Sequence, residues 1–117
     1  MVAVVDDDQS VRTATRGVLE SIGLTVMPYA SAEDFLAAKI DGFACLITDL
    51  KMPGIDGLEL QRRLIAQGRK VPIIFLSAYG ASESRSRALD AGALAFLDKP
   101  FDDDVLIEIV KKAVSEA

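Results

Sequence analysis

The sequence predicts an α/β fold in which a five-stranded parallel sheet is covered by helices on both faces. Five short apolar runs alternate along the 117 residues with five segments of helical character. Runs that are apolar throughout are typical of strands buried on both faces. Polar residues follow four of the runs at their carboxyl ends. Because strands joined by helices are parallel with right-handed crossovers, we expect one sheet and a single domain over residues 1–117.

The ends of the first strand and helix are marked by charged residues and glycine. Val2–Val5 is a continuous apolar run that stops at Asp6. Over Gln9–Ile22 the apolar residues recur at helical spacing, with Asp8 as the N-cap and Gly23 as the stop. We therefore expect a central strand followed by one amphipathic helix.

The second strand is predicted to lie at an edge of the sheet. It covers Leu24–Tyr29 and contains Pro28, which has no N–H to donate to a neighbouring strand. The next helix follows Ser31–Asp34, which resembles a capping box, and Asp41–Gly42 is expected to close it.

The third and fourth strands are predicted from the apolar runs Phe43–Ile47 and Val71–Leu76. The third run leads through Thr48 to Asp49, and Met52–Gly57 then supplies a turn. A helix is expected over Leu58–Gln67. Its apolar residues are Leu60, Leu64 and Ile65.

The fourth helix, Ala81–Ala91, is predicted to be loosely held, because only Ala88 and Leu89 can anchor it. The fifth strand is expected over Ala93–Leu97. A hydrophobic staple between Phe101 and Leu106, across an Asp102 cap, is predicted to start the last helix. The apolar stripe of that helix is Val105, Leu106, Ile109, Val110 and Ala113.

Composition narrows the class of protein. A net charge of −5 with 50% hydrophobic residues is typical of a globular domain and disfavours direct binding of nucleic acid. One cysteine, Cys45, is too few for a disulfide framework or thiolate metal site, and we interpret it as a small buried hydrophobe. No apolar run approaches the ~20 residues that span a bilayer. Met1–Asp6 reaches charge too early for a signal peptide, so we expect a cytoplasmic protein without a membrane segment.

The residues that interrupt the strands predict a functional site. Asp6 and Asp7 follow the first strand, Asp49 the third, Ser77 the fourth and Lys99 the fifth. The carboxyl ends of parallel strands lie on one rim of the sheet, where ligands bind in open α/β folds. If the strand order is 2-1-3-4-5, the flavodoxin-like (βα)5 arrangement, the first and third strands are neighbours and three carboxylates crowd together.

Crowded carboxylates need a cation or raised pKa values. An oxygen-only ligand set without histidine or cysteine suits Mg²⁺. With a lysine and a hydroxyl on the same rim, the residues fit phosphoryl transfer to a carboxylate. Taken singly, Asp6 and Asp7 could be helix caps, Ser77 a turn hydroxyl and Phe96 a core aromatic.

Five motifs together resemble the response-regulator receiver domain of two-component signalling, over essentially all 117 residues. They are Val5–Asp7, Asp49 with Met52–Gly57, Ser77–Ala78, Ala91–Ala93 and Lys99–Phe101. The stretches Ser31–Leu36 and Thr48–Pro53 are most similar to the FixJ-like subgroup.

The resemblance implies a role for each site residue. Asp49 would be the phosphoacceptor, and Asp6, Asp7 and the backbone carbonyl of Lys51 would hold Mg²⁺ with it. Asp8 would be a helix cap or a water ligand.

Three further residues would respond to the phosphoryl group. Lys99, with a cis bond to Pro100, would bind one phosphoryl oxygen, and Ser77 would hydrogen-bond another. Phe96 stands at the aromatic switch position, where many relatives carry tyrosine, and it can signal only by packing. By their position two residues after Asp49 and Ser77, Lys51 and Tyr79 are expected either to line the mouth of the site or simply to be exposed.

The resemblance also implies partners. The sequence contains no histidine, so a histidine kinase or histidine phosphotransfer protein would supply the phosphoryl group. The face of the fourth helix, fifth strand and last helix would then control an output, such as a helix-turn-helix domain in a longer chain or a phosphorylation-enhanced homodimer. The domain would catalyse only its own phosphorylation and dephosphorylation, so it would be a switch and not a conventional enzyme.

Three alternatives remain open at this point. A haloacid-dehalogenase-type phosphatase would carry a second acid two residues after the nucleophile, where this chain has Lys51. A flavodoxin-like FMN carrier would need a hydroxyl- and glycine-rich loop in place of Asp6–Asp8. A phosphorylation-independent adaptor would have lost a key residue, and none is lost.

Overall fold

The sheet is built from five parallel strands in the order β2-β1-β3-β4-β5, as the sequence predicts. The computed structural model describes residues 1–78 and 82–116. The strands are β1 (Val2–Val5), β2 (Val26–Tyr29), β3 (Cys45–Asp49), β4 (Ile73–Ser77) and β5 (Ala95–Asp98). β2 is an edge strand, so Pro28 is tolerated there.

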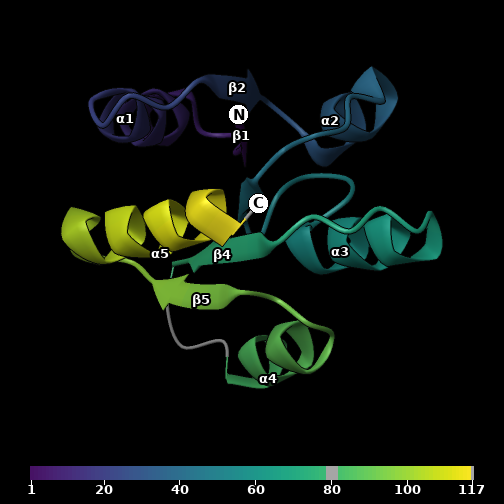
Figure 1. The fold of residues 1–117 in the computed structure, drawn as a ribbon. Coiled ribbons are helices and arrows are strands. Elements are labelled where there is room, and N and C mark those ends of the chain that lie inside the picture. The colour runs from purple at the N-terminus through teal and green to yellow at the C-terminus, as the bar shows by residue number, and fades with distance from the viewer. Residues whose placement is uncertain (79–81, 117) are drawn as a thin grey trace.

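Helices cover both faces of the sheet (Figure 1). They are α1 (Gln9–Glu20), α2 (Ala32–Ala38), α3 (Gly57–Ala66), α4 (Ser82–Asp90) and α5 (Asp103–Glu116). One core cluster contains Leu19 of α1 and Val110 of α5, and the other contains Phe35 of α2, Leu60 of α3 and Ala88 of α4. The two clusters lie on opposite faces because alternate residues of a strand point to opposite sides.

The central strands are buried on both faces, which explains their continuous apolar sequence. Val2 and Val4 belong to one cluster, whereas Ala3 and Val5 belong to the other. Cys45 is fully buried, and burial raises the pKa of its thiol to about 11. This agrees with its interpretation as a small hydrophobe.

The strand boundaries differ systematically from those predicted. β2, β3, β4 and β5 each begin two residues later than the apolar run that predicts them. Phe43 and Ala44 precede β3 and are nevertheless buried, so their apolar character reports burial and not strand pairing. At the other end, the last three strands include the polar residues Asp49, Ser77 and Asp98, because their backbones still pair with the neighbouring strand.

Two helices end two or more residues earlier than predicted. α1 stops at Glu20 instead of Ile22. α2 stops at Ala38, because Lys39 adopts a left-handed conformation with φ of 51°, and Asp41–Gly42 lies beyond the helix. The predicted N-caps are confirmed, since Asp8 accepts hydrogen bonds at the start of α1 and Ser31 does so at the start of α2.

Some predicted core residues are exposed. Ile65 and Val105, predicted as apolar positions of their helices, are 55% and 44% exposed. Leu89, predicted to anchor the fourth helix, is 39% exposed. Ala88 is the one buried residue of α4, which agrees with a loosely held helix. Ala81, its predicted first residue, and Tyr79 lie outside the described residues.

The start of α5 is built largely as expected. The Asp102 carboxylate accepts a hydrogen bond from the N–H of Asp104 at 2.9 Å, and Phe101 packs against the cluster that contains Leu106.

No helix in the described ranges is long and apolar enough to cross a membrane.

Replacing a fully buried residue of the central strands should be far more destabilising than replacing an exposed apolar one. We expect Leu46→Ala to lower the free energy of unfolding by about 2–5 kcal/mol, because it leaves a cavity beneath the sheet. Ile65→Ala is the matched control and should change it by less than about 1 kcal/mol. Urea denaturation measures both, and equal losses would contradict the assignment of the core.

Candidate functional site

Three carboxylates meet at the carboxyl ends of β1 and β3. Carboxylate oxygens of Asp6, Asp7 and Asp49 all lie within 4.8 Å of one another. The fold brings them together because β1 pairs with β3, with Val5 opposite Thr48. The proximity predicted from the strand ends is therefore present in the structure.

Asp6 is the most buried of the three, with 2% of its surface exposed. Its Oδ1 accepts a hydrogen bond from the N–H of Asp8 at 2.9 Å, and its carbonyl accepts one from Arg12 Nη1 at 2.7 Å. Burial raises the pKa of Asp6, with a smaller contribution from Asp49, while the Asp8 N–H opposes the rise. A nearby cation would relieve this cost of ionisation.

Asp49 ends β3 and is partly buried. Its Oδ1 accepts a hydrogen bond from the N–H of Leu50 at 2.9 Å and lies 3.7 Å from Lys99 Nζ. Burial raises the pKa of Asp49, and the positive charge of Lys99 is the largest opposing influence. Asp49 is thus a carboxylate that faces an ammonium group on one side and two acids on the other.

Lys99 and Ser77 complete the rim. Lys99 Nζ lies 4.0 Å from Asp6 Oδ2 as well as 3.7 Å from Asp49 Oδ1, so it faces both carboxylates. Its backbone N–H donates to the carbonyl of Ser77 at 2.6 Å, and the Lys99–Pro100 peptide is cis, as predicted. Ser77 is buried at the end of β4, the strand next to that of Asp49.

Asp8 is a helix cap. Its Oδ1 accepts hydrogen bonds from the N–H groups of Ser10 and Val11, at 2.9 and 3.2 Å. These contacts satisfy two of the free N–H groups at the start of α1. They support the capping interpretation of Asp8 over a direct role in the carboxylate cluster.

Gly57 has a role at the site that the sequence analysis missed. A Cβ added there would lie 2.6 Å from the carbonyl oxygen of Asp49 and 3.0 Å from the ring of Phe75. Its N–H donates to the carbonyl of Leu50 at 2.8 Å. The absence of a side chain therefore lets α3 begin directly behind Asp49, and a glycine at a helix start was the available signal.

Phe96 already occupies a buried position. Only 3% of it is exposed, and its ring centroid lies 5.8 Å from that of Phe75. A ring that signals by packing therefore starts from a buried position in this structure. The guanidinium of Arg85 lies over the ring, a contact that the sequence did not indicate.

The donor set fits a hard divalent cation. All three side chains offer oxygen, they converge within 4.8 Å, and burial raises the pKa of two of them. Mg²⁺ prefers oxygen ligands and commonly uses few carboxylates. Lys51, whose carbonyl was predicted as a ligand, is exposed two residues after Asp49.

Comparison with known proteins gives a consistent result. Residues 2–111 match the family model of the response regulator receiver domain. The transcriptional regulatory protein TdiR of Thauera aromatica is 43% identical over 115 residues, which are 97% of this chain and 51% of TdiR. The transcriptional regulatory protein FixJ of Azorhizobium caulinodans is 39% identical over 99% of this chain and 56% of its own length. This chain thus spans about half the length of these relatives.

Solved structures agree. The crystal structure of FixJ-N superposes with a TM-score of 0.90 at 36% identity, covering 99% of this chain and 94% of that one. A receiver protein from Pseudoalteromonas atlantica gives a TM-score of 0.91 at 27% identity, over 98% and 97% of the two chains. The chain belongs to the response regulator receiver domain family, whose members are phosphorylation-dependent signalling switches of two-component systems.

Proposed function

We propose that this receiver domain accepts a phosphoryl group on Asp49 from a histidine kinase or histidine phosphotransfer protein, with Mg²⁺ as cofactor. The observation that carries the proposal is the position of Asp49, which faces both the acidic pair and the ammonium of Lys99. Asp6, Asp7, Asp49 and the carbonyl of Lys51 would hold the Mg²⁺ ion.

The reaction is an exchange of one bond to phosphorus for another. An oxygen of the Asp49 carboxylate attacks the phosphorus, the bond from phosphorus to the donor imidazole nitrogen breaks, and its electron pair leaves with the imidazole. Lys99 Nζ, already beside Asp49, binds a phosphoryl oxygen, and the hydroxyl of Ser77 donates to another. A Mg²⁺ ion held by these residues would neutralise part of the charge on the phosphoryl oxygens.

Reversal of the signal uses the same residues. Water attacks the phosphorus of the aspartyl phosphate, the bond to the Asp49 oxygen breaks, and inorganic phosphate leaves. The domain thus acts on its own carboxylate, which is why we regard it as a switch and not as an enzyme with a separate substrate. Family membership sets aside the dehalogenase-type phosphatase and the FMN carrier, and phosphorylation itself tests the adaptor alternative.

The donor is proposed to dock over a groove between α1 and α5, beside Lys99. The groove has a volume of about 210 Å³ and is lined by Val11, Ala14, Thr15, Val18, Leu76, Lys99, Phe101, Asp103 and Leu106. Two residues of α1 are unsuitable for testing this proposal. Thr15 is buried, and Arg12 donates to the carbonyl of Asp6, so changing either would disturb the structure.

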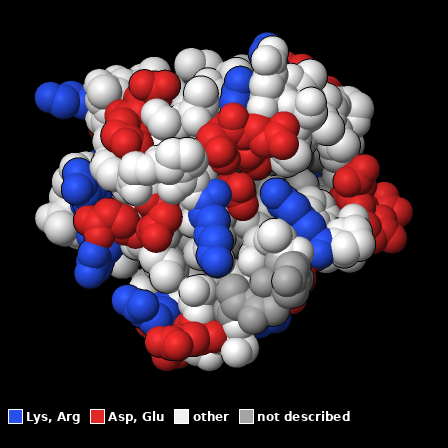
Figure 2. Space-filling model, turned by 180° about the vertical axis from the view of Figure 1, so that it is seen from behind, with Lys and Arg blue, Asp and Glu red and all other residues white. Residues whose placement is uncertain are grey.

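The output is proposed to lie outside these 117 residues. The relatives named above are transcriptional regulatory proteins of about twice the matched length, which favours a helix-turn-helix domain in a longer chain. A second proposed output is a phosphorylation-enhanced homodimer formed through α4, β5 and α5. We also propose that the protein is cytoplasmic. On the face drawn in Figure 2, the lysine and arginine side chains of the described residues alternate with acidic ones and form no separate basic patch. This mixture of charges argues against direct binding of nucleic acid by this domain.

Asp49 should be the single phosphorylation site. Incubation with acetyl phosphate and Mg²⁺ should add one base-labile phosphoryl group to the wild type, seen by mass spectrometry. Asp49→Asn should abolish the adduct, whereas Asp103→Asn, at the start of α5, should leave it unchanged. Persistence of the adduct in Asp49→Asn would refute the assignment.

The affinity for Mg²⁺ should depend on Asp7, a proposed metal ligand, and not on Asp8, the neighbouring cap of α1. Asp7→Asn should lower the affinity at least about ten-fold, because it removes a ligand charge. Asp8→Ala should leave the affinity within about two-fold of wild type, yet lower the free energy of unfolding by about 1 kcal/mol through loss of the α1 cap. Calorimetric titration and urea denaturation give the two quantities, and equal losses of affinity would contradict the ligand assignment.

The same titration should depend on pH in a defined direction. Burial raises the pKa of Asp6 and Asp49 in the folded protein, so protons compete with the metal ion for these carboxylates. The affinity for Mg²⁺ should therefore fall as the pH drops through the raised pKa values.

A bulky charge in the α1–α5 groove should block transfer from a protein donor only. Ala14→Arg introduces it at an exposed position that lines the groove. We expect transfer from a phosphorylated kinase to fall at least about ten-fold, with acetyl phosphate labelling unchanged. Thr13→Arg, exposed on α1 but not lining the groove, is the matched control. Loss of both reactions in Ala14→Arg would indicate damage to the site instead of docking.

A further inference from the structure

α4 is attached to the rest of the domain mainly by polar contacts. Ala88 is the one residue of Ser82–Asp90 that is buried. A helix with so little buried apolar surface depends on the hydrogen bonds and charges that its side chains make. Two such attachments, one from α3 and one to β5, differ in how firmly they hold the helix.

The first attachment fixes the carboxyl-terminal end of α4. Gln61 of α3 is 4% exposed, and its Nε2 donates to the carbonyl of Ala88 at 3.0 Å. The same carbonyl accepts the N–H of Ala93 at 3.0 Å. Breaking these bonds would leave a buried carbonyl without a partner, so this end of α4 moves little relative to α3.

The second attachment involves Arg85, one turn earlier on α4. Its guanidinium carbon lies 5.8 Å from the centroid of the Phe96 ring, and its Nη1 lies 3.8 Å from Asp98 Oδ2. Arg85 and Asp98 are each about half exposed, so both contacts are individually weak and reversible. Together they place a cation over the outer side of a buried ring.

The position of this contact connects it with the phosphorylation site. Asp98 directly precedes Lys99 and lies opposite Ser77 in the sheet. The Lys99 N–H bonds to the Ser77 carbonyl, so the end of β5 is fixed to the end of β4. The carboxylate that holds Arg85 and the ammonium that faces Asp49 therefore belong to consecutive residues, the last residue of β5 and the one that follows it.

We propose that Arg85 is the positioning residue of this switch, holding the Phe96 ring in its buried position and so favouring the phosphorylated state. Phenylalanine has no hydroxyl with which to anchor itself in that position. The guanidinium of Arg85, oriented by Asp98, supplies that anchor from outside the ring, and it makes α4 and Phe96 move together about the Gln61–Ala88 contact. This inference rests on the proposed function, because it concerns how phosphorylation of Asp49 is coupled to α4.

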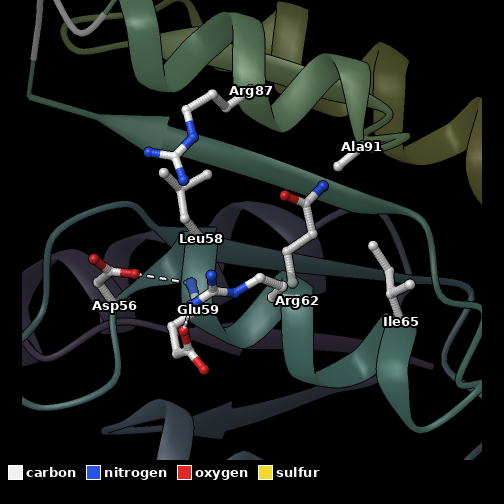
Figure 3. Close-up of a pocket in the computed structure, with 8 residues that line it drawn as sticks. Asp56, Leu58, Glu59, Arg62, Ile65, Arg87 and Ala91 are labelled. Carbon is white, nitrogen blue, oxygen red and sulfur yellow. Dashed lines mark hydrogen bonds and ion pairs between the residues drawn. The ribbon is translucent and has the colours of Figure 1, made fainter.

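Arg87 provides a matched control on the same helix. Figure 3 shows Arg87 reaching from α4 toward Leu58 of α3, across a cavity of about 300 Å³ that Glu59 and Ile65 also line. Its guanidinium thus faces α3, whereas that of Arg85 lies over Phe96 of β5. Replacing Arg87 removes the same charge from α4 without removing the contact with the ring.

The effect of Arg85 should be measurable at the phosphorylation site, because coupling between two sites acts equally in both directions. If Arg85 favours the state that binds a phosphoryl group, losing it must weaken binding of the phosphoryl analogue beryllofluoride. In NMR titrations with Mg²⁺ and beryllofluoride, we expect Arg85→Met to lower the affinity about three- to ten-fold. Arg85→Lys should recover most of it, Asp98→Asn should lose part of it, and Arg87→Met should match the wild type.

A double-mutant cycle shows whether Arg85 acts through the ring. In a Phe96→Leu background, Arg85→Met should cause little further loss, because no ring is left to hold. Amide exchange should become faster over residues 82–85 in Arg85→Met and stay protected at 88–90. An unchanged affinity in Arg85→Met, or an equal loss with and without Phe96, would overturn the proposal. Failure of wild-type protein to bind beryllofluoride would instead count against the proposed function.

Discussion

The crowding of three carboxylates at the ends of two adjacent parallel strands is the constraint around which this domain is organised. Asp6 and Asp49 are partly withdrawn from water, which raises the pKa of each, and Asp7 adds a third charge. Such a cluster opposes folding when it is ionised and uncompensated. Lys99 compensates only in part, because one ammonium lies 3.7–4.0 Å from two carboxylates. A divalent cation bound among the three carboxylates would relieve this cost.

The parallel sheet provides the precision that this arrangement needs. β1, β3, β4 and β5 each deliver one part of the site from the same rim, and backbone pairing sets their separation. Side chains cannot be placed this way by loops alone, since loops are more mobile than the strands they connect. The close approach of Gly57 to the Asp49 carbonyl extends the same rigidity to α3. Asp49 is therefore surrounded by backbone that has little freedom to move.

Much of the fold and of the candidate site could be predicted, because the pattern of apolar and charged residues indicates which segments are buried. Polar residues that interrupt apolar runs identified the rim, and Pro28 identified an edge strand. The starts of four strands were placed too early, because residues such as Phe43 are apolar in order to cover the core and not to pair. The contacts of Gln61 with Ala88 and of Arg85 with Phe96 could not be predicted, since they depend on how two helices pack and not on any local pattern.

The central strands are held much more firmly than α4, and this difference in stability would let a reaction at Asp49 change the position of α4. The central strands bury almost every side chain, whereas α4 buries Ala88 and otherwise relies on contacts worth about 1 kcal/mol or less each. Under the proposed function, a new charge on Asp49 would leave the sheet in place but would change which packing of α4 is preferred. A shift of about 1.4 kcal/mol changes a population ten-fold, so the weak contacts of this helix are the ones that a phosphoryl group on Asp49 would be able to reverse. The structure is rigid at the site and loosely held at α4, and this contrast favours α4 as the element that responds.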